Sequence, residues 1–157
     1  TEVANKRYLQ EFLSRALGDA IRYRAPLAVM LLELDRFAGI IAQLGQLGGD
    51  FTLRAAATRL KLSIRQEDLL ARYDETVFAL VLPGTHRAGA STLAERLRRL
   101  IESQPLRFEE VVYGVTLSLG VAVADGQDWL TSGELLDQAR AQLRAACQRG
   151  GNCVVVG

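Results

Sequence analysis

Several charged side chains in this chain stand at spacings that suit ligand chemistry. Glu33 lies near the end of an apolar run, and Asp74 and Glu75 are adjacent. Carboxylates brought together could hold a cation such as Mg²⁺, although a solvated turn explains Asp74 and Glu75 as well. Arg65 and Asp68 have the spacing of a helical surface ion pair. A guanidinium group can also donate two hydrogen bonds to one planar acceptor, which suits a nucleobase or a phosphate.

Nucleophilic and soft metal-ligating side chains are few. The sequence contains two cysteines, Cys147 and Cys153, and one histidine, His86. A structural zinc site normally uses four such ligands, and a disulfide framework needs more cysteines. We therefore predict neither, and expect Cys147 and Cys153 to be small residues of a protein in a reducing cytoplasm.

Composition favours one compact domain. The chain has 157 residues, a formal net charge of +1, 49% hydrophobic residues and 24% charged residues. This charge balance argues against nucleic acid or a membrane surface as a partner. No apolar run approaches the roughly 20 residues that span a bilayer. Because the sequence opens at Thr1, we expect residues 1–157 to be a single domain cut from a longer multidomain protein, in the cytoplasm or on the cytoplasmic side of a membrane.

Hydrophobic periodicity predicts alternating helices and strands. Helices are expected over 5–23, from about 35 to 44, and over 50–64, 86–103 and 132–148, and strands over 27–34, 69–73, 77–82, 108–113, 115–123 and 153–156. Asp50 is a candidate helix cap after the glycine-rich break at 45–49. Short turns predict that 69–73 pairs with 77–82, and 108–113 with 115–123. Trp129 is expected to pack at the start of the last helix. This order implies a two- or three-layer α/β sandwich with a mixed central sheet flanked by helices.

Five motifs in order along the chain resemble the GGDEF family, the diguanylate cyclase domain. They are TEVANKRYL at 1–9, LLELDRF at 31–37, GQLGGD at 45–50, RYDETVF at 72–78 and VTLSLGVA at 115–122. The resemblance covers essentially the whole chain and implies the GGDEF-like, nucleotidyl-cyclase-like fold. Family members join two GTP molecules into cyclic di-GMP, with one GTP on each of two facing domains.

The resemblance also implies that this chain departs from the family signature. Positions 74–78 read DETVF, so both glycines are absent and Thr76 stands at the metal-binding acid. Asp74 and Glu75 add bulk and negative charge where a triphosphate would lie. Glu33 replaces the other metal-binding Asp and keeps a carboxylate.

Other positions for the substrate differ too. Ile41 replaces the guanine-reading Asn, Asp50 retains the guanine-reading Asp, and Cys147 and Gly151 replace the phosphate-binding Lys and Arg. From these positions we expect that the chain is not an enzyme and that it uses neither Mg²⁺ nor another cofactor.

One ligand site of the family is retained in sequence. Arg65 and Asp68 form an Arg-x-x-Asp motif five residues before the signature, and Arg96 matches a helper arginine. In the family these residues bind cyclic di-GMP as a feedback inhibitor, often as an intercalated pair of molecules. The resemblance therefore predicts a cyclic di-GMP receptor, in which a homodimer or docking to other domains of the parent protein follows binding. The alternatives are an interaction module that binds no nucleotide, for instance through the helix at 5–23, and a metal-dependent nucleotide enzyme.

Overall fold

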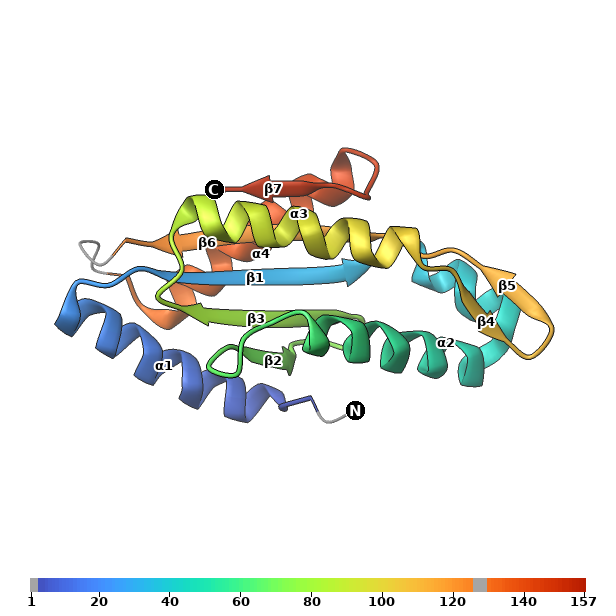
Figure 1. Cartoon of the computed structure of the whole chain (residues 1–157), viewed down its shortest axis with the longest axis horizontal. Helices are drawn as coiled ribbons and strands as arrows, with labels where there is room; N and C mark the ends of the chain where they lie inside the picture. Colours follow the sequence, from blue (N-terminus) through green and yellow to red (C-terminus); the bar gives the residue numbers. More distant parts are fainter. Residues whose placement is uncertain (1–2, 126–129) are drawn as a thin grey trace.

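The computed structural model describes residues 3–125 and 130–157, so Trp129 lies outside the described residues. The chain alternates between helices and strands, as Figure 1 shows. The elements are α1 (Lys6–Tyr23), β1 (Leu27–Leu34), α2 (Phe37–Leu62), β2 (Leu69–Arg72), β3 (Val77–Pro83), α3 (Arg87–Ser103), β4 (Leu106–Phe108), β5 (Val111–Tyr113), β6 (Leu117–Ala124), α4 (Ser132–Gln148) and β7 (Val154–Val156).

A five-stranded mixed sheet forms the centre of the molecule. Its strand order is β2-β3-β1-β6-β7. β1 lies in the middle and pairs antiparallel with both β3 and β6, whereas β7 runs parallel to β6. The sequence of β1, LAVMLLEL, is apolar on both faces of the pleat, as expected for a strand covered on both sides.

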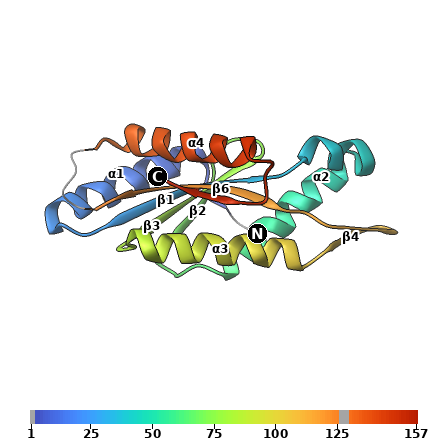
Figure 2. The same ribbon diagram turned by 90° about the horizontal axis from the view of Figure 1, so that it is seen from above.

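The molecule has three layers, because helices cover both faces of this sheet. Figure 2 shows α1 and α4 on one face and α2 and α3 on the other. Alternate residues of β1 divide between two cores: Leu27, Val29 and Leu31 pack with the α1 and α4 side chains, and the intervening residues pack with those of α2 and α3. The predicted fold class is confirmed, and the open choice between two and three layers resolves to three.

Helix α4 lies unusually close to strand β6. A Cβ atom placed on Gly120 would come within 2.1 Å of the Leu143 backbone nitrogen and 2.4 Å of the Ala139 carbonyl oxygen. Only glycine allows this backbone approach. The close packing fixes the C-terminal end of α4, where Cys147 lies, relative to the sheet.

The predicted break between two helices at 45–49 is wrong, because the interruption of α2 is a single residue long. Only Gly45 has a non-helical backbone, with φ 77° and ψ 178°, and the helix resumes at the next residue. A Cβ atom on Gly49 would lie 2.8 Å from Ile41 and 3.2 Å from Phe37, so the two halves of α2 pack closely across the kink. Asp50 is therefore inside the helix rather than its cap, and it accepts a hydrogen bond from Gln46 at 3.2 Å.

The predicted pairing of 108–113 with 115–123 is also wrong. β4 pairs with β5 in a separate two-stranded sheet, and β6 alone joins the central sheet. Glu109, with φ 55°, allows the tight turn between β4 and β5. This hairpin packs on α2 through the rings of Phe51 and Phe108, whose centroids are 5.5 Å apart, and through the 2.6 Å hydrogen bond between the hydroxyl groups of Thr52 and Tyr113.

Over the described ranges 3–125 and 130–157, no helix is both long enough and hydrophobic enough to cross a bilayer.

Candidate functional site

Arg72 stabilises the turn at 74–76 through hydrogen bonds to its backbone. The Arg72 guanidinium group donates to the carbonyl oxygens of Asp74 and Glu75, at 3.1 and 3.0 Å from Nε, and lies 5.6 Å from the centroid of the Phe78 ring. The Asp74 carboxylate accepts the Glu75 backbone N–H at 2.9 Å. None of residues 74–76 has a positive φ, so this turn forms without glycine.

A cavity of about 570 Å³ lies beside this turn, between the start of α2 and the end of α4. Glu33, Ile41, Thr76, Cys147 and Gly151 all contribute to its lining. Thr76 donates to Glu33 Oε2 at 3.0 Å, and the Cys147 thiol donates to Glu33 Oε1 at 3.6 Å. Burial, and then the negative charge of Glu33, raise the pKa of Cys147. The structure therefore brings these sequence-predicted positions together around one carboxylate.

Asp35 joins three segments at the far wall of the same cavity. It accepts hydrogen bonds from Thr116 Oγ1 at 2.6 Å, from Ser118 Oγ at 2.6 Å and from the Asn152 backbone N–H at 2.8 Å. Gly151 has φ 81°, and a Cβ atom there would lie 2.7 Å from Asp35 Oδ1. The carboxylate of Asp35 thus holds the turn after α4 against β1 and β6.

Both carboxylates in this cavity are already engaged. A divalent cation would have to displace Thr76 or Cys147 from Glu33, or the donors that hold Asp35. Within the described residues, no group of three or more His, Cys, Asp or Glu side chains is arranged to hold a metal ion. This arrangement does not fit a preformed Mg²⁺ site, and the expectation about cofactors stays a prediction.

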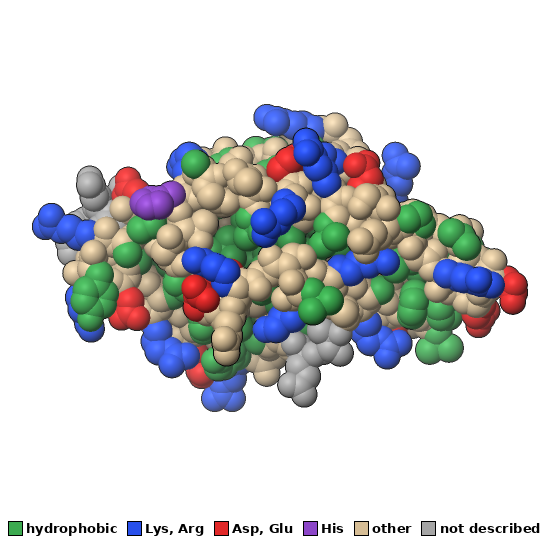
Figure 3. Space-filling view, in the orientation of Figure 1, with side chains coloured by type: hydrophobic (Ala, Val, Ile, Leu, Met, Phe, Trp, Pro, Cys, Tyr) green, Lys and Arg blue, Asp and Glu red, His purple; other side chains and the backbone are tan. Residues whose placement is uncertain are grey.

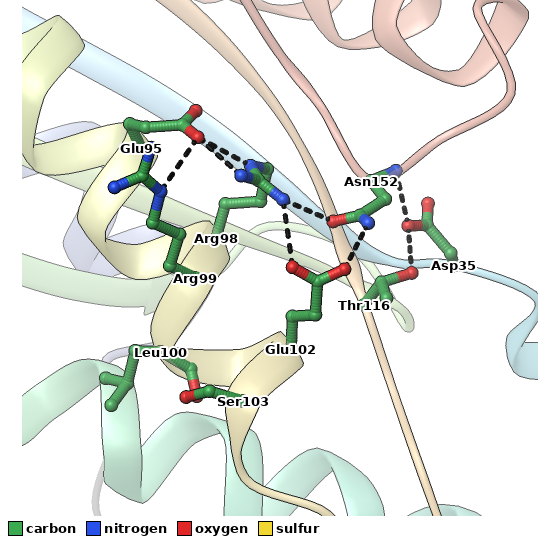
Figure 4. Close-up of polar contacts among 9 residues, drawn as sticks. All are labelled: Asp35, Glu95, Arg98, Arg99, Leu100, Glu102, Ser103, Thr116 and Asn152. Carbon is green, nitrogen blue, oxygen red and sulfur yellow. Dashed lines mark hydrogen bonds and ion pairs between the residues drawn. The ribbon is translucent and has the colours of Figure 1, made fainter.

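A polar network links helix α3 to Asp35, as Figure 4 shows. Arg98 bonds to Glu95 through Nε at 3.0 Å and to Asn152 Oδ1 through Nη1 at 2.9 Å, and Asn152 Nδ2 donates to Glu102 at 2.6 Å. The Arg98 side chain is only 15% exposed. Sequence reasoning missed this network, although acidic residues three before and four after Arg98 are a recognisable pattern for helical ion pairs.

A second cavity, of about 450 Å³, lies between the loop after α2 and the first half of α3. Arg65, Asp68 and Arg96 all line it. The structure therefore brings together the three residues that the sequence singled out for a ligand. Sequence reasoning did not identify the other residues that line it. They are small or hydroxyl side chains and two larger apolar ones: Ser63, Ile64, Thr85, Ala88, Gly89, Thr92 and Leu93.

Asp68 holds Arg65 in a fixed orientation within this cavity. Its carboxylate accepts the Arg65 backbone N–H at 2.9 Å and both Nε and Nη2 of the guanidinium group, at 3.3 and 2.9 Å. Arg65 Nη2 also lies 2.8 Å from the Pro83 carbonyl oxygen and 3.0 Å from Thr85 Oγ1. The Asp68 side chain is 1% exposed and that of Arg65 is 48% exposed. The hydrogen bond to Asp68 raises the pKa of Arg65.

The opposite wall of this cavity is the start of α3. Arg96 reaches across and donates to the Ser63 carbonyl oxygen at 3.3 Å. The helix begins after His86 with no side-chain cap and no acidic residue in its first turn, so no side chain of the cap position satisfies its first N–H groups, which remain donors. In Figure 3, Lys and Arg side chains are spread singly over this face of the molecule.

The fold and these two cavities define an α/β domain with two candidate ligand sites. The chain matches the family model described as "Diguanylate cyclase, GGDEF domain" over residues 1–153. It belongs to the GGDEF family, which confirms the resemblance found in the sequence.

Curated relatives support the same family. The chain is 32% identical to the bifunctional diguanylate cyclase/cyclic di-GMP phosphodiesterase MucR of Pseudomonas aeruginosa over 152 residues. This match covers 97% of this chain and 22% of MucR. It is 31% identical to the response regulator PleD of Caulobacter vibrioides, covering 99% of this chain and 34% of that one. The chain thus spans between about a fifth and a third of the length of these relatives.

Solved structures match the fold closely. The GGDEF domain of TpbB from Pseudomonas aeruginosa superposes with a TM-score of 0.92 at 28% identity, covering 99% of this chain and 97% of that chain. The GGDEF domain of DgcB from Caulobacter crescentus, in complex with c-di-GMP, gives a TM-score of 0.93 at 24% identity, covering 99% and 89%.

The prediction that this chain is not an enzyme is wrong by these comparisons. MucR and DgcP of Pseudomonas aeruginosa, which match 97% and 96% of this chain, are named as diguanylate cyclases, which are enzymes. The prediction rested on side-chain types at single positions. The structure retains the Glu33 carboxylate on an open cavity of about 570 Å³, and it retains the acid Asp50, which lines a separate cavity with Arg54 and Arg72. The substitutions therefore do not by themselves establish loss of activity.

Proposed function

We propose that this GGDEF domain binds cyclic di-GMP in the cavity lined by Arg65, Asp68 and Arg96. One observation carries the proposal: a loop after α2 and a helix more than twenty residues further along the chain converge, and they place two arginines and a buried acid around one space of about 450 Å³. An isolated surface ion pair would need no second wall. The DgcB domain, which has the same fold, was solved with c-di-GMP bound.

The donors at this site suit a guanine base and a phosphate. Arg65 Nη1 makes a 3.6 Å ion pair with Glu67 and, among the described residues, no hydrogen bond, so its N–H groups can donate to an acceptor of guanine such as O6 or N7. Arg96 and the exposed N–H groups at the start of α3 are donors for a phosphate.

Asp68 acts in this proposal mainly on Arg65. Its carboxylate is buried and accepts three hydrogen bonds from that one residue. It therefore fixes the guanidinium plane before a ligand arrives, which reduces the entropy lost on binding.

The ligand that we propose is an intercalated pair of cyclic di-GMP molecules, bridging to a second domain or a second copy. Binding would shift the parent protein between domain arrangements by its different affinity for each. We also propose a cytoplasmic location. Both cysteines, Cys147 and Cys153, are free thiols, which supports a reducing compartment.

Calorimetric titration with cyclic di-GMP tests the proposal. We expect micromolar binding by the wild type and a loss of at least about tenfold in affinity for Arg65→Ala, because a charge-assisted hydrogen bond contributes roughly 1.5–3 kcal/mol. Arg99→Ala is the matched control, since Arg99 lies on α3, is 72% exposed and does not line the cavity. Absence of heat with the wild type, or equal binding by Arg65→Ala, refutes the proposal.

Cyclic di-GMP synthesis is the second candidate function, favoured by the names of the relatives. Incubation with GTP and Mg²⁺, followed by chromatographic detection of cyclic di-GMP, tests it directly. Glu33→Gln is the informative variant, because Glu33 is the carboxylate at the centre of the cavity beside the 74–76 turn.

A further inference from the structure

A third cavity lies beside α1 and adjoins the cavity of Arg65, because Pro83, which lines it, accepts a hydrogen bond from Arg65 at 2.8 Å. It has a volume of about 450 Å³ and lies between α1 and the two chain segments at Ala25–Pro26 and Pro83–Gly84. These segments are joined by the hydrogen bond from the Gly84 N–H to the Pro26 carbonyl oxygen at 2.9 Å. Its wall is largely apolar, and we call it the α1 groove: Tyr8, Phe12, Arg15, Ala16, Asp19, Ala20, Tyr23, Ala25, Pro26, Pro83 and Gly84.

The helical part of the α1 groove is one continuous face. The aromatic and small residues that line it recur at intervals of three or four, so they form a stripe along the helix. At 1.5 Å per residue, Tyr8 and Tyr23 mark a stripe of about 22 Å. Tyr8 is 44% exposed and Tyr23 is 69% exposed. A second helix of similar length would cover this stripe.

Two opposite charges stand in the middle of the stripe. Arg15 and Asp19 are four residues apart on α1, yet neither has an ion pair or hydrogen bond with another residue in the ranges that the structure describes. The arginine precedes the acid, which is the weaker order for pairing within a helix. Both charges therefore stay available to a partner.

We propose that the α1 groove binds the α1 helix of a second copy of this chain, in an antiparallel pair. A two-fold axis near residue 17 places Arg15 opposite the partner's Asp19, and Asp19 opposite the partner's Arg15. The aromatic end at Tyr8 and Phe12 then lies toward the Tyr23 end of the other copy. The charges of this face are thus complementary to those of a second copy, as an isologous interface requires. This interface needs no nucleotide, and its lining residues differ from those of the cyclic di-GMP site, which it adjoins at Pro83.

A charge-exchange experiment tests this dimer. Sedimentation velocity without nucleotide, from low to high micromolar protein, should show a monomer–dimer equilibrium for the wild type. Arg15→Asp and Asp19→Arg should each weaken the homodimer by at least about tenfold, because each sets like charges opposite one another. Mixing the two variants should restore a heterodimer of near wild-type affinity, since opposite charges then face again at both contacts.

Matched controls separate this interface from general effects of charge. Arg7→Asp lies on α1, at a position 90% exposed and outside the α1 groove, and should leave the dimer unchanged. Tyr23→Glu alters the apolar stripe without altering the central charges, and should also weaken the dimer. A wild type that stays monomeric throughout overturns the proposal, as does a dimer that both charge variants leave intact or a mixture that forms no heterodimer.

Discussion

Replacing Asp35 with alanine should destabilise the protein by about 3 kcal/mol. The carboxylate accepts hydrogen bonds from Thr116, Ser118 and the Asn152 N–H, all within 2.8 Å. Ser118 is fully buried, so its hydroxyl group would lose its acceptor where water has poor access. Each orphaned donor costs about 1 kcal/mol or more, which gives the total of about 3 kcal/mol. For a domain of this size that is a fall in melting temperature of roughly 6–12 °C.

Urea unfolding followed by circular dichroism measures this difference. Asp50→Ala is the control, because Asp50 is exposed and has a single hydrogen bond to Gln46 at 3.2 Å, and its loss should change the unfolding free energy by less than about 0.5 kcal/mol. If Asp35→Ala unfolds with the same midpoint as Asp50→Ala, Asp35 does not hold the turn after α4 in place.

Three further predictions concern packing and ionisation. Gly120→Ala should destabilise by more than about 3 kcal/mol in urea unfolding, because its Cβ would clash with the α4 backbone, whereas Gly114→Ala meets no atom within 4 Å and should be nearly neutral. Burial raises the pKa of Cys147, so its rate of reaction with a disulfide reagent should still be increasing at a pH where a free thiol has levelled off. Hydrogen bonds from Arg98 lower the pKa of Glu95. The Glu95 carboxylate therefore stabilises the fold above its pKa in the unfolded chain, and this stabilisation is lost as the pH falls through its pKa in the folded protein. The unfolding free energies of Glu95→Gln and wild type should converge at acid pH.

Much of the fold could be predicted because the hydrophobic patterns of its main helices and strands extend over many residues. The apolar run of β1 and the helical stripe of α1 end within one residue of their predicted bounds. Short-range features failed where one residue decides the geometry. A single left-handed residue, Glu109, ends β4 and turns the chain into β5, where the sequence predicted one strand over 108–113. Gly45 alone carries the kink in a helix whose neighbouring glycines stay helical.

The sequence predicted which charged residues line the candidate site, but it did not predict how those residues contact one another. Register along the chain identified Arg65, Asp68 and Arg96, and the structure places them on one cavity. That Asp68 is buried against Arg65 depends on the packing of β2 and β3, which fixes where the loop after α2 ends. The network from Arg98 to Asp35 joins segments far apart in sequence, so local patterns could not reveal it.

The role of Asp68 can be separated from that of a direct guanine contact. If its carboxylate only orients Arg65, as its 1% exposure and its three bonds from that residue indicate, Asp68→Asn should weaken cyclic di-GMP and its hypoxanthine analogue by the same factor. The analogue lacks the guanine 2-amino group. A carboxylate that accepts from that group, and binds it more strongly than a neutral amide oxygen does, would make the wild type discriminate between the two ligands more than Asp68→Asn does. Calorimetry on the four combinations gives the coupling as a double-mutant cycle. A coupling near zero establishes Asp68 as a positioning residue, whereas a coupling of 1 kcal/mol or more, on the order of a charged hydrogen bond, would mean that the carboxylate leaves Arg65 and turns to the base when the ligand binds.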